Sequence, residues 1–152
     1  MKTHFKLLLA AVFLFFIYTP CIEAQILQTQ EEIIETYGEP FSSGISKSGE
    51  NYLFYKIPVN TEASGSFNQG WVLYLKTFNN GSQVCYKFKI VEPTSETNYN
   101  INSFNRDLVQ TDDMKWKDYA KGITYTVKEV KGVCLITAEY NNDVGLAKVY
   151  KF

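Results

Sequence analysis

The sequence has a single histidine, His4, and only three cysteines in 152 residues. We expect His4 to be removed with an N-terminal leader, so the mature chain would have no imidazole. Ser-His-Asp and Cys-His catalysis both need an imidazole that transfers a proton near neutral pH, and we therefore exclude them. The chain also has no glycine-rich phosphate loop and no zinc-ligand spacing of Cys and His. We predict no cofactor and no metal site.

Neither sign of charge is in large excess, and long apolar runs are scarce. The net charge is −1, and removal of Lys2, Lys6 and Glu23 with the leader changes it to −2. This balance has none of the basic excess of a nucleic-acid-binding protein. The one long apolar run, Leu7–Ile17, has 11 residues, too few to cross a hydrocarbon core of ~30 Å as a helix. We predict no nucleic-acid partner, and no membrane span after cleavage.

The first 24 residues are organised as a secretory signal peptide. A positively charged start precedes the apolar run, Pro20 ends it, and the small residue Ala24 marks the expected cleavage site. The mature protein would be one domain, residues 25–152, secreted into the periplasm or the extracellular space. Lipidation at Cys21 is the alternative, but Pro20 replaces the small residue that normally precedes a lipidated cysteine.

Two short helices are expected. Thr29 and Glu32 predict a capping box at the start of the first helix, which ends at Gly38. The second is expected over about Ile101–Gln110, with Asn100 as its N-cap.

Alternating apolar and polar residues predict strands on both sides of the second helix. The expected strands are Gly44–Lys47, Asn51–Ile57, Trp71–Phe78, Gln83–Val91, Ile123–Val130, Val133–Tyr140 and Val144–Phe152. Asn60–Gly70 is polar and is predicted to be a loop, while Met114–Tyr119 is compatible with a strand or an irregular connection. The fold class is therefore α+β, a largely antiparallel sheet of about six to eight strands with two short helices packed on one face.

Each half of the chain places a short helix before a set of hairpin strands. The first helix exits through Tyr37-Gly38-Glu39-Pro40 into Tyr52-Leu53-Phe54-Tyr55. This order of elements resembles the fold of β-lactamase inhibitor proteins and of small outer-membrane assembly lipoproteins. The resemblance implies a helix–hairpin fold and transfers no functional residue.

Cys85 and Cys134 are the cysteines of the mature chain. An exported protein with two cysteines is expected to form one disulfide. Strict alternation instead places Cys85 on the face of Lys87 and Lys89, away from the apolar face that holds Cys134. The sequence leaves both alternatives open: a possible disulfide, or two thiols that do not meet.

Carboxylates are the remaining catalytic candidates, since Asp107, Asp112, Asp113 and Asp118 follow one another closely. Two acids that converge in one cleft could hydrolyse a glycan. Solvated residues at a helix end are the more common origin of such a cluster, so we assign no catalytic residue.

Aromatic residues make up 16% of the chain. Trp71, Tyr74, Trp116 and Tyr119 lie at strand starts or in connections, and aromatic side chains there can anchor a protein or a glycan. The alternative is that they fill the core of a small β-rich domain. Asn80-Gly81-Ser82 is an N-glycosylation sequon and also a good hairpin turn.

From these features we predict a non-enzymatic secreted or cell-envelope domain that binds a partner. A small carboxylate-dependent hydrolase acting on glycans and a structural envelope component are the alternatives. The sequence does not determine the oligomeric state.

Overall fold

The computed structural model describes residues 25–141. The expected signal peptide, the alternative lipidation site Cys21 and the expected strand Val144–Phe152 lie outside the described residues. Among the helices of the described part, none is long and apolar enough to cross a membrane.

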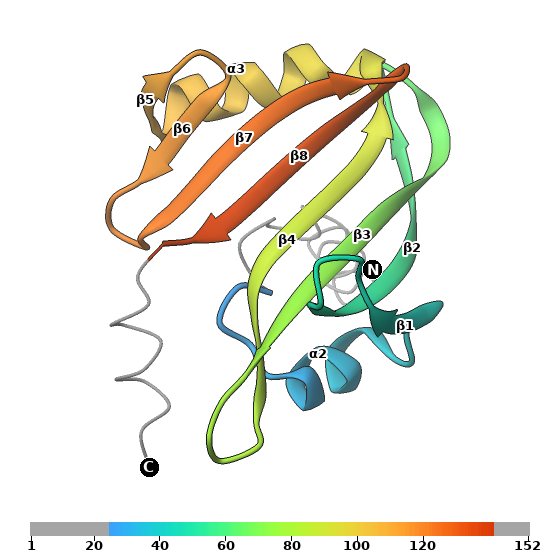
Figure 1. Cartoon of the computed structure of the whole chain (residues 1–152). Coiled ribbons are helices and arrows are strands. Elements are labelled where there is room, and N and C mark those ends of the chain that lie inside the picture. The colour runs from blue at the N-terminus through green and yellow to red at the C-terminus, as the bar shows by residue number, and fades with distance from the viewer. Residues whose placement is uncertain (1–24, 142–152) are drawn as a thin grey trace, which may run out of the picture.

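One antiparallel sheet of eight strands dominates the fold (Figure 1). The strands are β1 (Ser42–Ile45), β2 (Asn51–Thr61), β3 (Gly65–Thr77), β4 (Gln83–Pro93), β5 (Val109–Asp112), β6 (Lys115–Asp118), β7 (Ile123–Val130) and β8 (Val133–Tyr140). Their order across the sheet is β1-β2-β3-β4-β8-β7-β6-β5. The α+β class and the antiparallel sheet predicted from the sequence are confirmed.

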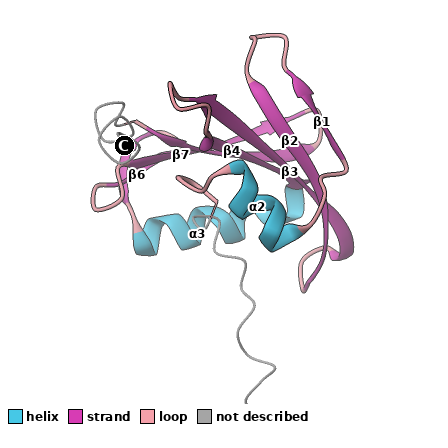
Figure 2. Ribbon diagram, turned by 90° about the horizontal axis from the view of Figure 1, so that it is seen from below, coloured by secondary structure: helices cyan, strands magenta, loops and turns pink. Residues whose placement is uncertain are grey.

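The two α-helices lie on the same side of the sheet (Figure 2). Helix α2 (Gln30–Tyr37) begins with the predicted capping box. Glu32 donates its backbone N–H to Thr29 Oγ1 at 3.2 Å, and Thr29 donates its own N–H to Glu32 Oε2 at 2.8 Å. Helix α3 (Thr97–Asp107) follows a single 3-10 turn, η1 (Thr94–Glu96).

The fold consists of two similar halves. In each half, an α-helix precedes four consecutive antiparallel strands: α2 with β1–β4, and α3 with β5–β8. The last strands of the halves, β4 and β8, pair with each other from Lys87↔Glu139 to Pro93↔Val133 at the centre of the sheet. The outermost strands are therefore β1 and β5, the first strand of each half.

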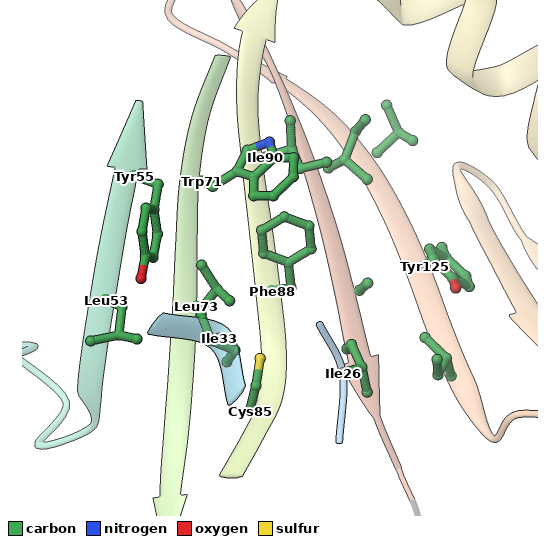
Figure 3. Packing of buried hydrophobic residues seen from close by; sticks show 14 of the residues in the cluster. Ile26, Ile33, Leu53, Tyr55, Trp71, Leu73, Cys85, Phe88, Ile90 and Tyr125 are labelled. Atoms are coloured by element: carbon green, nitrogen blue, oxygen red, sulfur yellow. The ribbon is translucent and has the colours of Figure 1, made fainter. Parts of the chain in front are cut away.

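Both helices and the sheet enclose one continuous core (Figure 3). Ile33 of α2 is fully buried, and Trp71 of β3 packs edge-on against Phe88 of β4, with ring centroids 5.2 Å apart. In the second half the ring centroids of Phe104 in α3 and Trp116 in β6 lie 5.5 Å apart. Aromatic side chains thus provide much of the buried apolar volume of the domain.

The Asn60–Gly70 segment was predicted to be a loop, and this prediction is wrong. It forms the turn end of the β2–β3 hairpin, whose last pair is Thr61↔Gly65. Its side chains are polar because this end of the hairpin extends towards solvent, and polarity alone does not distinguish such a strand from a loop.

A polar network around the buried Glu96 holds the turn of that hairpin against η1, just before α3. Thr61 and Ser64 each donate a hydroxyl to Glu96 Oε1 at 2.5 Å. Asn100 was predicted to be the N-cap of the second helix, but α3 starts earlier, at Thr97, so Asn100 lies within it. The side-chain amide of Asn100 donates to Glu92 at 2.5 Å. Burial, reinforced by the charge of Glu96, raises the pKa of Glu92.

Candidate functional site

The side of the sheet opposite the helices, here called the outer face, carries no helix of the described chain (Figure 2). Alternation along β2 and β3 directs Leu53, Tyr55, Trp71 and Leu73 into the core, where each is at most 4% exposed. The intervening side chains point to the outer face. Aromatic and lysine residues on β2, β3 and β4 are among them, including Tyr52, Phe54, Lys56, Tyr74 and Lys89.

Two of these aromatic side chains lie across glycines of the neighbouring strands. A Cβ atom at Gly70 would lie 3.4 Å from Phe54 Cε2, and one at Gly44 would lie 3.5 Å from the hydroxyl oxygen of Tyr52. The glycines therefore allow the rings to pack closely against the sheet. Phe41, just before β1, packs edge-on against Phe54 at 5.9 Å and extends this apolar surface to the edge of the sheet.

Lysine ammonium groups lie over the same rings. Lys56 Nζ is 3.6 Å from the ring centroid of Phe41, while Lys87 Nζ and Lys89 Nζ are 4.6 Å and 5.1 Å from that of Tyr74. These are cation–π distances. We call this set of residues the aromatic–lysine surface; its members are Phe41, Tyr52, Phe54, Tyr74, Tyr86, Lys56, Lys87 and Lys89.

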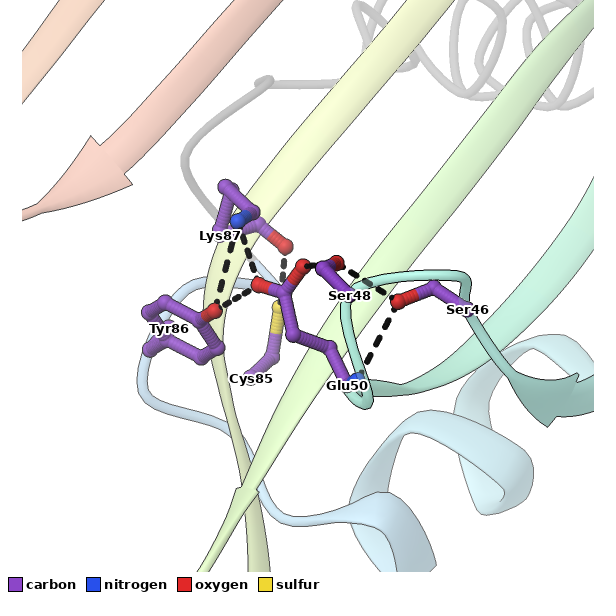
Figure 4. Close-up of polar contacts among 6 residues, drawn as sticks. All are labelled: Ser46, Ser48, Glu50, Cys85, Tyr86 and Lys87. Carbon is purple, nitrogen blue, oxygen red and sulfur yellow. Dashed lines mark hydrogen bonds and ion pairs between the residues drawn. The ribbon is translucent and has the colours of Figure 1, made fainter.

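A polar cluster forms one end of this surface (Figure 4). Glu50, just before β2, accepts hydrogen bonds from Lys87 Nζ at 2.5 Å, from the Ser48 hydroxyl and from the Tyr86 hydroxyl. Lys87, then Ser48 and Tyr86, lower the pKa of Glu50 to about 2. A shallow open depression of about 470 Å³ lies beside the cluster and is lined in part by Glu50, Tyr86 and Glu139.

A β-bulge in β4 places the side chains of Tyr86 and Lys87 next to each other, so that both reach Glu50. Tyr74 pairs with Lys87 and the next residue, Leu75, pairs with Cys85, so Tyr86 is the extra residue on β4. The insertion reverses the alternation before it. For this reason Cys85 faces the core, contrary to the sequence prediction, and Figure 3 shows it beside Leu73 and Phe88.

The possible disulfide is absent, since Cys85 and Cys134 are both free and buried. They lie on the same face of the sheet, but Cys134 is opposite Glu92, seven positions along β4 from Cys85. That separation is on the order of 20 Å, whereas the Cα atoms of a disulfide lie within about 7 Å. Burial raises the pKa of the Cys85 thiol to about 12, which disfavours the reactive thiolate.

The four aromatic residues predicted as a binding site are divided between core and surface. Trp71 and Trp116 are 2% and 1% exposed, and both belong to the core. Their indole N–H groups donate to Gln69 and Asn105. Tyr74 is half-buried on the outer face, and Tyr119 is 65% exposed in the β6–β7 turn, with Lys117 Nζ 4.8 Å from its ring centroid. Truncating the two tryptophans would therefore test the stability of the core first.

The four aspartates do not converge on one cleft. Asp107 is exposed and pairs with Arg106, and Asp112 and Asp113 are exposed in and beside β5. The Asp118 carboxylate accepts the backbone N–H groups of the β6–β7 turn. Within residues 25–141, no group of three or more Asp, Glu, Cys or His side chains is arranged to hold a metal ion.

Comparison of the chain with protein-family models, with curated proteins and with solved structures gives no match. The likeness to helix–hairpin folds therefore rests on the order of elements alone.

Most of the aromatic–lysine surface was missed by the sequence prediction, which had identified only Tyr74. The signal was present in β2, where Tyr52, Phe54 and Lys56 alternate with apolar residues. Two aromatic residues on the polar side of an alternating strand indicate a surface that is not merely solvated. The contributions of Phe41 and Tyr86 depend on the β1 edge and on the bulge, neither of which the sequence pattern indicates.

Proposed function

We propose that the protein is a non-enzymatic binding domain that acts outside the cytoplasm and binds a partner protein through its aromatic–lysine surface. The observation that carries the proposal is the combination of rigid aromatic side chains and lysines on a sheet face that no described helix covers. Tyrosine and phenylalanine give a large contact area at low cost in conformational entropy. Location outside the cytoplasm rests on the leader sequence.

The charges on the surface favour a partner with acidic groups. Lys87 is neutralised by Glu50, but Lys56 and Lys89 contact aromatic rings and are paired with no carboxylate in the described part of the chain. An acidic side chain next to an apolar one would complement both features of the surface. A glycan would use the aromatic rings but would leave these two charges without a counterpart.

The alternative of a glycan hydrolase has less support, because its four aspartates are dispersed. A purely structural envelope role remains an outcome of the test below.

The test compares proteins captured from the native extracytoplasmic fraction by the mature chain and by two variants, with quantification by mass spectrometry. We expect the double variant Lys56→Glu/Lys89→Glu to lose the captured partner at moderate salt. Tyr99→Ala, which changes an exposed aromatic residue of α3 (69% exposed), should retain it. Matched circular dichroism spectra would show that all three proteins are folded.

Equal capture by the wild type and the charge-reversed variant would contradict the proposal. Binding to glycans that survives the charge reversal would assign the surface to carbohydrate instead. No specific capture at all would favour the structural role.

A further inference from the structure

Lysine side chains on the outer face continue beyond the aromatic–lysine surface into the second half of the molecule. Trp116 of β6 and Val127 of β7 are each 1% exposed and point into the core. Their neighbours Lys115, Lys117 and Lys128, here called the second-half lysines, therefore point to the outer face, since successive side chains of a strand alternate between faces. Lysines thus lie on the outer face on both sides of the β4–β8 ladder, which joins the two halves.

The register of the sheet places these lysines at opposite ends of transverse rows. Opposed residues of paired strands have their side chains on the same face. Across the strands, the rows are Lys87↔Glu139↔Thr124↔Lys117, Lys89↔Thr137↔Thr126↔Lys115 and Lys56↔Gly70↔Val91↔Leu135↔Lys128. Each row begins with a lysine of the first half and ends with a lysine of the second half. The two ends are separated by about 14 to 19 Å at the spacing of paired strands.

The strip between the two sets of lysines is mostly apolar or hydroxylic. Its side chains are half-buried, and they are Thr124, Thr126, Thr137, Val91, Leu135 and the one carboxylate of these rows, Glu139. An apolar centre with a charged margin is the usual anatomy of a protein–protein interface.

The two sides of the domain carry charge of opposite sign. The second-half lysines form no ion pair within residues 25–141, although Asp112 lies opposite Lys115 near the edge of the sheet. On the helix side, α2 contains glutamates and neither lysine nor arginine. The near-zero net charge of the chain therefore conceals a basic sheet face, and charge complementarity favours an acidic partner for it.

We propose that the partner-binding surface spans the whole outer face, and that it fits a protein surface on which two acidic margins flank an apolar strip. Lys56 and Lys89 contact one margin, and the second-half lysines contact the other. This inference rests on the proposed function and extends it across the β4–β8 ladder.

A protein surface fits these features better than a linear polyanion such as an acidic polysaccharide. A polyuronate carries a carboxylate on every sugar. Any such chain that reaches both sets of lysines also places carboxylates over the strip, where Glu139 repels them and no lysine of the strip pairs with them. A protein can place apolar side chains there instead.

Binding of a synthetic acidic polypeptide tests this extension. The probe is a fluorescently labelled random copolymer of glutamate and tyrosine, and fluorescence anisotropy measures its dissociation constant. We expect Lys115→Glu/Lys128→Glu to weaken binding about tenfold or more, because two attractive contacts become repulsive. The matched control, Arg106→Glu/Lys131→Glu, makes the same change in charge at exposed residues of α3 and of the β7–β8 turn. It should weaken binding less than about twofold, because charges outside the contact are screened by salt.

Chemical footprinting gives a second measurement on the unmodified protein. Brief acetylation followed by mass spectrometry reports how accessible each lysine is. We expect the copolymer to protect Lys115 and Lys128 as well as Lys56 and Lys89, and to leave Lys131 as reactive as in the free protein.

The outcomes separate this inference from the proposed function. Loss of binding in Lys56→Glu/Lys89→Glu alone, without protection of the second-half lysines, would confine the partner to the first half and overturn only the extension. Unchanged binding in both charge-reversed variants would overturn both, and a wild-type protein that does not bind the copolymer would overturn this inference. Polygalacturonate that binds as tightly as the copolymer would assign the surface to acidic polysaccharides instead.

Discussion

At the scale of single residues, Glu50 connects the β1–β2 turn to the bulge in β4. Its carboxylate accepts hydrogen bonds from side chains of both segments, and its side chain is 23% exposed. These bonds favour the ionised form in the folded protein and lower the pKa from 4.5 to about 2. Folding and ionisation are therefore coupled at this residue.

We predict that Glu50→Gln removes a pH-dependent part of the stability. A lowered pKa in the folded state stabilises the protein above the unfolded pKa of 4.5, and this contribution disappears as the pH falls towards about 2. At neutral pH the variant should lose about 1 kcal/mol, because partial exposure screens the ion pair. The free energy of unfolding of both proteins, measured by urea titration between these pH values and neutrality, checks this.

The two stability curves should converge at the acidic end. Asp113→Asn, which changes an exposed acid far from the cluster, is the control and should leave the acidic slope unchanged. A constant difference between the wild type and Glu50→Gln at every pH would show that packing, rather than charge, is lost.

Residue-level features were the least accessible from sequence. The alternation in β4 predicted one apolar face, but the extra residue Tyr86 shifted Cys85 from the solvent side to the core. A bulge is a property of strand pairing, and nothing in the local pattern of one strand reports it. The burial of Trp71 and Trp116 depends in the same way on contacts with distant elements.

At the scale of elements, local signals were reliable wherever they did not depend on a partner strand. The predicted strands Ile123–Val130 and Val133–Tyr140 coincide with β7 and β8. The capping box of α2 was also predicted correctly. The β2–β3 turn and the start of α3 were predicted wrongly, because both are ordered by Glu96 and Glu92 rather than by their own sequences.

We predict that Thr29→Ala destabilises the domain through α2. The substitution removes the acceptor for the N–H of Glu32, which caps the first turn of a helix only eight residues long. Loss of such a cap costs about 1 kcal/mol, and a short helix has little intrinsic stability to offset it. Thermal and urea unfolding measure the loss.

Thr36→Ala is the matched control in the same helix, since Thr36 is exposed and its hydroxyl only bonds the Glu32 carbonyl. Its effect should stay within about 0.5 kcal/mol. Equal losses in the two variants would mean that the capping box does not contribute specifically.

At the scale of the whole molecule, the two halves share one sheet and one core. Their seam is the β4–β8 ladder, and the buried Glu96 of the second half accepts hydrogen bonds from Thr61 and Ser64 of the first. An open or polar interface between halves would allow each to unfold alone. The β4–β8 ladder is central and one apolar core runs across it, so we expect the halves to unfold together.

The tryptophans provide a direct test, because Trp71 lies in β3 of the first half and Trp116 in β6 of the second. In the single-tryptophan variants Trp116→Phe and Trp71→Phe, fluorescence reports on one half at a time, while far-ultraviolet circular dichroism reports on both. We predict that the two signals give the same urea midpoint within each variant, as two-state unfolding requires. A fluorescence midpoint that differs from the dichroism midpoint in either variant would show that the halves are separate cooperative units, and that the β4–β8 seam is weaker than its burial implies.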